Sequence, residues 1–165
     1  MKDAKAVATA TSRKQDELMK DAKAVAAAIS RKQDELLRGT IASDPSSLKA
    51  MFHPEFVSHG GFDKRQETPP PWHSADDELA GLSTLKIESN EIKKSQVIPF
   101  AQVAIATGVA HTKGTFDGKD ISGVYQFIQV WTLNPARIQA GMTSFAEATE
   151  SDLMLAACVN LPDAV

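Results

Sequence analysis

The sequence predicts an α+β protein in which helices pack on one face of a curved antiparallel sheet. Three observations lead to this class. Apolar residues at helical spacing fill the N-terminal part of the chain, long segments rich in valine, isoleucine and threonine fill the part after residue 84, and turn sequences separate those segments. Helices followed by a run of strands are typical of the α+β class, in which the helices collect on one side of the sheet.

The first predicted element is a long helix built from a tandem repeat. Residues 2–19 read KDAKAVATATSRKQDELM and residues 20–37 read KDAKAVAAAISRKQDELL, so that only three aligned positions differ. Each copy makes five turns at about 3.6 residues per turn, and one continuous helix would therefore carry both copies in the same rotational phase. The second copy has the more complete apolar stripe, because Ile29 stands where the first copy has Thr11. We therefore expect the second copy to dock on the core.

The first copy has more than one interpretation. Residues 2–19 extend the helix or fray at its end, or they compete for the docking groove, or they dock on a neighbouring subunit as a swapped element. The near-identity of the copies indicates a recent or an engineered duplication. We divide the chain into a duplicate segment at 2–19, a folded domain at 20–147 and a C-terminal tail at 148–165.

Local signals delimit the next elements. Gly39 is a helix stop and Asp44 precedes a proline that begins another helix. Ser74 is a helix cap with Asp77 at the third helical position, which is a weaker form of the capping box. These signals predict a short helix, a short strand, a proline-rich loop and a third helix, at 45–52, 55–59, 62–73 and 74–82.

Four long strands follow, predicted at 85–98, 102–116, 119–133 and 136–146. Asp117-Gly118 is a strong two-residue hairpin signal, and Asn134-Pro135 is a further turn, so the strands are expected to form an antiparallel meander. The apolar piece at 153–159 is expected to cover a sheet edge or to fray.

The third of these strands carries large side chains on both faces. Alternation places Tyr125, Phe127, Gln129 and Trp131 on one side and four other residues, most of them apolar, on the opposite side. Apolar residues on both sides predict burial on both sides, and a second protomer is the expected cover. The aromatic side is either the wall of a binding site or the contact with that protomer.

Three phrases in the sequence resemble the nuclear transport factor 2-like superfamily, in particular its SnoaL-like branch. They are DPSSLKAMFHPEFVSHG, VAIATGVAHTKGTFDGKDISG and VYQFIQVWTLNPARIQAGMTS, and the resemblance covers about residues 20–147. One departure is Ile138, where the family often has an aromatic residue. The resemblance implies a cone-shaped fold, in which a curved sheet wraps around the long helix, with an apolar pocket at the open end and commonly a homodimer. It does not fix the function, because the superfamily includes isomerases, cyclases, dehydratases and binding modules.

Candidate catalytic residues are those that could act as acid or base in such a pocket. His59 ends the short strand beside two glycines, and His73 ends the proline-rich loop. Either is a proton acceptor or an ordinary solvated histidine, and Tyr125 is the candidate donor. The candidate ligand-binding residues are mainly aromatic and amide side chains, namely Phe56, Trp72, Phe127, Gln129, Trp131, Gln139 and Thr143. The proline-rich loop is a candidate lid, in which Trp72 stacks on a flat ligand or packs on the rim.

The positions of the carboxylates give less support to a catalytic site. Asp77 and Glu78 belong to an acidic cluster at the third helix, where such residues usually serve the helix N-terminus or solvent. No carboxylate stands alone in an apolar strand, where a proton-abstracting isomerase of the fold that the resemblance implies would be expected to carry one. This absence weakens the enzyme hypothesis.

Composition excludes several classes of function. The net charge of -3 gives no reason to expect nucleic acid or an anionic membrane as partner, and the single cysteine, Cys158, excludes an internal disulfide. We expect a cytoplasmic protein without metal or cofactor. The favoured hypothesis is a cofactor-independent isomerase, cyclase or dehydratase acting on an apolar small molecule. The alternative is a non-catalytic hydrophobic-ligand-binding or assembly module.

Overall fold

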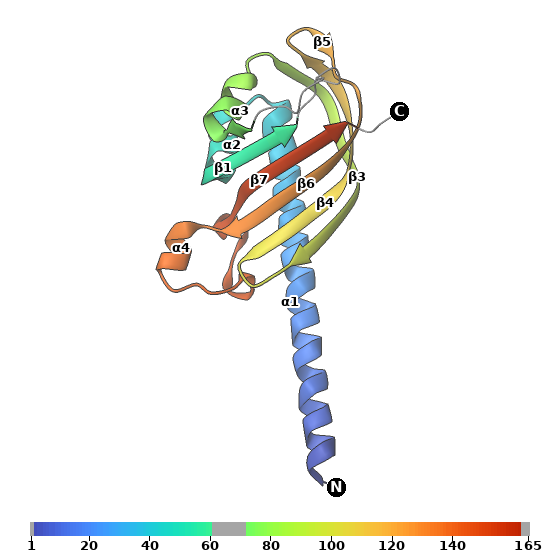
Figure 1. Cartoon of the computed structure of the whole chain (residues 1–165), viewed down its shortest axis with the longest axis vertical. Coiled ribbons are helices and arrows are strands. Elements are labelled where there is room, and N and C mark those ends of the chain that lie inside the picture. Colours follow the sequence, from blue (N-terminus) through green and yellow to red (C-terminus); the bar gives the residue numbers. More distant parts are fainter. Residues whose placement is uncertain (1, 61–71, 163–165) are drawn as a thin grey trace.

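The computed structural model describes residues 2–60 and 72–162, with side chains from residue 21 onward in those ranges (Figure 1). One curved sheet wraps around part of a long helix, which confirms the predicted α+β class. The helices are α1 (Lys2–Ile41), α2 (Pro45–Met51), α3 (Ala75–Gly81) and α4 (Pro135–Gln139). The strands are β1 (Phe52–Gly60), β2 (His73–Ser74), β3 (Leu85–Pro99), β4 (Val103–Phe116), β5 (Lys119–Asp120), β6 (Gly123–Leu133) and β7 (Leu153–Pro162).

The helix α1 carries both copies of the repeat without a break, as the sequence predicts. Val25, Ile29 and Gln33 lie one turn apart on one face of the second copy and are all buried. This face packs against β3 and joins the main core, which includes Trp131 and Leu153. The first copy continues along the same axis and projects beyond the sheet (Figure 1).

The short helices α2 and α3 begin at the caps that the sequence predicts. The Asp44 side chain accepts hydrogen bonds from the backbone N–H groups of Ser46 and Ser47, at 3.1 and 3.2 Å. At α3, Ser74 and Asp77 form a reciprocal capping box. Two of the orphan donors at this N-terminus are thereby satisfied, so α3 is held at a defined angle to the chain that precedes it.

The sheet has the strand order β2-β1-β7-β6-β4-β3, with β5 paired to β4. All neighbours are antiparallel except β1 and β7, which run parallel, so the sheet is mixed and not purely antiparallel. The predicted hairpin turn is confirmed: Asp117 and Gly118 have positive φ angles of 50° and 73° and join β4 to β5. Positive φ at both central residues suits the twist of a tight hairpin.

The predicted strand at 136–146 and the predicted edge or fray at 153–159 are both wrong. Asn134 accepts a hydrogen bond from the Ala136 N–H, and Pro135 then begins the helix α4. Asparagine followed by proline starts a helix as readily as a turn, because both residues suit the helix N-terminus. The strand that pairs with β6 is instead β7, which lies inside the sheet between β1 and β6. The sheet therefore extends beyond residue 147.

The two faces of β6 differ in burial. Tyr125, Phe127, Gln129 and Trp131 are all buried on the concave side of the sheet, toward the interior of the same chain. On the convex side Ile128 is 43% exposed. The aromatic face is therefore internal, and the convex face is the one that a partner could cover.

Candidate functional site

A cavity of about 490 Å³ lies between the concave face of the sheet, the C-terminal end of α1, and the helices α2 and α3. Most of its wall is apolar, with Phe52 and Phe56 of β1 stacked at a ring separation of 4.2 Å. Phe127 of β6 and Leu155 of β7 also line the cavity, and Leu155 is the register partner of Phe52 on the neighbouring strand. A cavity of this size and lining is typical of a site for a small organic molecule.

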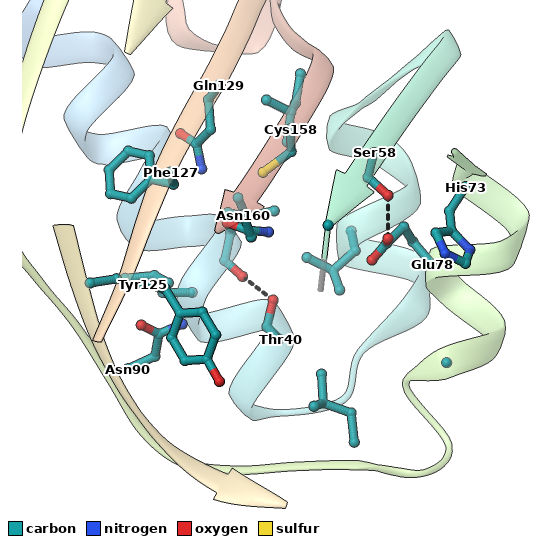
Figure 2. Close-up of a pocket in the computed structure, with 18 of the residues that line it drawn as sticks. Thr40, Ser58, His73, Glu78, Asn90, Tyr125, Phe127, Gln129, Cys158 and Asn160 are labelled. Carbon is teal, nitrogen blue, oxygen red and sulfur yellow. Dashed lines mark hydrogen bonds between the residues drawn. The ribbon is translucent and has the colours of Figure 1, made fainter. Parts of the chain in front are cut away.

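One side of the cavity carries a carboxylate and an imidazole. Period-two alternation along β1 turns Phe56 and Ser58 inward, and the Ser58 hydroxyl donates a hydrogen bond to the Glu78 carboxylate of α3. Figure 2 shows Ser58 and Glu78 pointing toward each other, and His73 also lines the cavity. Ser58 is buried whereas Glu78 is exposed, so this pair lies where the cavity opens to solvent.

Asp77 also lines the cavity, but its carboxylate is engaged. It accepts hydrogen bonds from the Ser74 N–H at 2.8 Å and from the Ser74 hydroxyl at 2.7 Å. The backbone bond from Ser74 is the main cause that lowers the pKa of Asp77, followed by the Ser74 hydroxyl, with a smaller contribution from His73. Asp77 is thus a charged helix cap. Of the two carboxylates that line the cavity, Glu78 is the one available to act on a bound molecule.

The inner wall combines the amides of Gln129 and Asn160 with the Cys158 thiol. Gln129 accepts hydrogen bonds from Gln33 of α1 at 2.8 Å and from the Trp131 indole at 3.2 Å, so its carbonyl oxygen is held by the core. Next to it, burial raises the pKa of the Cys158 thiol to about 12, with the charge of Glu78 as a second cause. The thiol is therefore neutral at physiological pH and is not an activated nucleophile.

Tyr125 lies in the wall as well, near Asn90 (Figure 2). Its hydroxyl donates a hydrogen bond to the Ile121 carbonyl at 2.6 Å, and burial, followed by the charge of Asp120, raises the pKa of the phenol. The proton that Tyr125 would give to a ligand is therefore committed to the backbone. This geometry favours a positioning role for Tyr125.

Five of the predicted site residues line the cavity: Phe56, His73, Tyr125, Phe127 and Gln129. His59 does not, because it follows Ser58 and alternation turns it to the convex side, where its ring contacts Trp72 in a tilted arrangement with the ring centroids 4.6 Å apart. Trp72 is 61% exposed, and Trp131 is buried in the core below the cavity. Most of the predicted lid lies outside the described residues, which resume at Trp72.

Gln139 and Thr143 also lie away from the cavity. Gln139 is exposed on α4, and the Thr143 hydroxyl donates to Glu147 at 2.9 Å. The predicted strand that would hold both residues does not form, and α4 lies instead at the opposite end of the sheet from α3 (Figure 1).

The sequence does not indicate most of the other residues that line the cavity, among them Ser58, Glu78, Cys158 and Asn160. Ser58 could have been found from its alternation with Phe56, whereas Glu78 is indistinguishable in sequence from its acidic neighbours. Cys158 and Asn160 depended on β7, which the sequence reasoning did not find. Gly60 and Asn160 meet closely, since a Cβ on Gly60 would lie 1.9 Å from the Asn160 carbonyl oxygen. Glycine at this position allows the two strands to approach.

Within residues 2–60 and 72–162, no group of three or more histidine, cysteine or acidic side chains could hold a metal ion. No helix in the described part of the chain is long and apolar enough to cross a membrane.

Known proteins resemble this chain in structure and not in sequence. No protein-family profile and no curated protein matches its sequence. A nuclear transport factor 2-like protein from Cytophaga hutchinsonii superposes with a TM-score of 0.64 and 10% identity, over 82% of this chain and 95% of the other. A presumed dehydratase of the same family, from Streptomyces avermitilis, gives 0.61 and 10%, over 88% and 98%. The CaMKII hub of S. rosetta gives 0.55 and 14%, over 82% and 95%.

These likenesses show the fold. The chain has the nuclear transport factor 2-like fold, in which a curved sheet wraps around a long helix, and this confirms the resemblance seen in its sequence phrases.

Proposed function

We propose that the protein binds a mostly apolar small molecule in the cavity and transfers a proton on it without a cofactor, as an isomerase or lyase. The observation that carries this proposal is the presence of Glu78 and His73 in the wall of an otherwise apolar cavity of about 490 Å³. A carboxylate or an imidazole at the edge of an apolar space is the arrangement that general acid/base catalysis uses.

The roles follow from the hydrogen bonds. Glu78 accepts a proton from the bound molecule, and the Ser58 hydroxyl holds the carboxylate toward the cavity. The proton then returns to another atom of the same molecule in an isomerisation. In a dehydration, His73 gives a proton to a leaving hydroxyl, which departs as water. Tyr125 and the aromatic wall hold the molecule in place.

Deuterium incorporation tests the catalytic half of this proposal. Compounds selected by binding are incubated in D2O, and exchange of carbon-bound hydrogen is followed by NMR. We expect Glu78→Gln to lower the exchange rate by about 100-fold or more, which is the usual contribution of one general base. His59→Ala is the matched control, because His59 lies on the other side of β1. An unchanged rate in Glu78→Gln would refute the role of Glu78.

A second candidate is ligand binding without chemistry. It is favoured by the exposure of Glu78 and by the hydrogen bond that commits the Tyr125 proton to Ile121. Both candidates require an open cavity, so Ala110→Leu, which adds volume inside the wall, should abolish binding. Ala80→Leu makes the same change on the exposed side of α3 and should leave binding intact. Binding without any deuterium exchange would select this candidate.

We further propose a homodimer that covers the convex face of the sheet. Register pairs join Val57, Ala157, Val130, Ile105 and Ile98 into one row across five strands. Ile98 is 44% exposed, and an apolar row of this length is typical of a contact surface. The structural likeness to the hub supports self-association. Sedimentation velocity should show a dimer, and Ile128→Lys should convert it to a monomer. A monomer before substitution would refute the proposal.

The assignment to the SnoaL-like branch and the cytoplasmic location stay predictions of the sequence.

A further inference from the structure

The charges around the cavity are unequally distributed. Among the described residues that line it, two are carboxylates, Asp77 and Glu78, one is the imidazole of His73, and none is lysine or arginine. All other polar groups in this part of the wall are amides, hydroxyls and the Cys158 thiol. The opening near α3 is therefore the negative end of the cavity.

The negative charge is built into the fold at this end. The capping box holds the Asp77 carboxylate in its charged form, because the charged oxygen accepts the bonds from Ser74. The Glu78 carboxylate accepts the Ser58 hydroxyl, which donates its only proton there. Neither carboxylate forms an ion pair with a lysine or arginine among the described residues. A bound molecule therefore meets carboxylate oxygens that no lysine or arginine of the described residues neutralises.

The remote end of the cavity differs. Asn90, Thr112 and Tyr125 offer amide and hydroxyl groups, and Thr112 donates to Asn90 at 3.4 Å. Such groups bind neutral polar atoms and carry no net charge. The apolar wall between the two ends, with Phe127 and Leu155, fits an apolar body.

We propose that the cavity selects non-acidic apolar molecules that present a hydrogen-bond donor, a hydroxyl or a protonated amine, to Glu78, and that it rejects carboxylates. This selectivity rests on the proposed function, because it names the substrate class of the same cavity. A carboxylate ligand would place a third negative charge beside Asp77 and Glu78, whereas a donor satisfies the free lone pairs of Glu78. A hydroxyl at this position also supplies a proton that Glu78 could accept.

Three probes of one shape test the selectivity: 2-naphthylmethylamine, 2-naphthylmethanol and 2-naphthoate. Isothermal titration calorimetry at pH 7 should give the tightest binding for the amine, then the alcohol, with the amine at least about tenfold tighter than the carboxylate. In Glu78→Gln, which keeps the shape and removes the charge, the ratio between amine and carboxylate should fall to about threefold or less. The affinity for the alcohol should change least.

Glu88→Gln is the matched control. Glu88 pairs with Lys113 at 2.8 Å on the exposed side of β3 and β4 and does not line the cavity, so its loss should leave all three affinities unchanged. Thermal melting of each variant checks that it is folded. Equal affinities, or a preference for the carboxylate, would overturn the selectivity and leave the binding proposal standing. If neither the alcohol nor the amine binds, the binding proposal fails, and the selectivity fails with it.

Discussion

The two copies of the repeat in α1 have almost the same sequence and very different surroundings. Residues 20–37 pass under the concave sheet, where Ile29 is fully buried, and residues 2–19 continue beyond it (Figure 1). Both copies are helical, because helix formation depends on neighbours a few residues away. Burial depends on what the rest of the chain places against the helix. Local sequence therefore decided the secondary structure of both copies, and tertiary packing decided which of them carries the fold.

The largest difference between the copies is expected at Ile29. Ile29→Ala should lower the free energy of unfolding by about 3 kcal/mol, because it leaves a cavity in a closed part of the core. The aligned change in the first copy, Thr11→Ala, should alter it by less than about 0.5 kcal/mol. Urea denaturation measures both. Equal effects would show that the first copy is also packed.

Gln33 gives the next largest difference. Its amide donates to the buried Gln129 carbonyl at 2.8 Å, so Gln33→Ala removes one of the two donors to that oxygen, leaves the Trp131 indole in place and should cost about 0.5–1.5 kcal/mol. The aligned Gln15→Ala should have no measurable effect. A destabilised Gln15→Ala variant would contradict the assignment of 20–37 as the docked copy.

The dependence of stability on alkaline pH tests the burial of Cys158 in the domain into which the second copy packs. The pKa of Cys158 is raised from 9.0 to about 12 in the folded chain, so its stabilising contribution is complete below about pH 9 and is lost as the pH rises toward 12. At pH 10 the loss should be roughly 1 kcal/mol. Cys158→Ala should remove this part of the decline, and removal of residues 2–19 should not. An identical decline in Cys158→Ala would locate its cause elsewhere.

The smallest effect is expected from deleting residues 2–19. The remaining chain keeps the whole buried stripe of α1, so its free energy of unfolding should change by less than about 1 kcal/mol. Circular dichroism should show the loss of about five helical turns and an unchanged melting temperature. A collapse of thermal stability would mean that the first copy supports the fold, in its own chain or in a neighbouring one.

The strands show where local reasoning fails. Asp117-Gly118 predicts its hairpin correctly, because the two φ angles that it needs are set within the dipeptide. Asn134-Pro135 permits both a turn and a helix start, and the choice depends on β7, which occupies the place beside β6. Nothing within a few residues of Leu153 indicates that β7 lies inside the sheet. Its position is decided by pairing with β1, which is about 100 residues away in sequence.

In the candidate site, too, some features depend on local sequence and others on tertiary packing. Alternation and helical spacing determined that Phe56 shares a face with Ser58, that Tyr125 shares one with Phe127, and that Ser74 caps α3, since these depend on the geometry of a single element. Which face is internal, and which carboxylate meets the cavity, was decided only when α3 packed against β1. That contact brings Glu78 to Ser58, 20 residues away, and so makes the face of β1 that carries Ser58 the internal one. Local rules act over one or two turns, whereas a cavity is enclosed by surfaces that only the complete fold brings together.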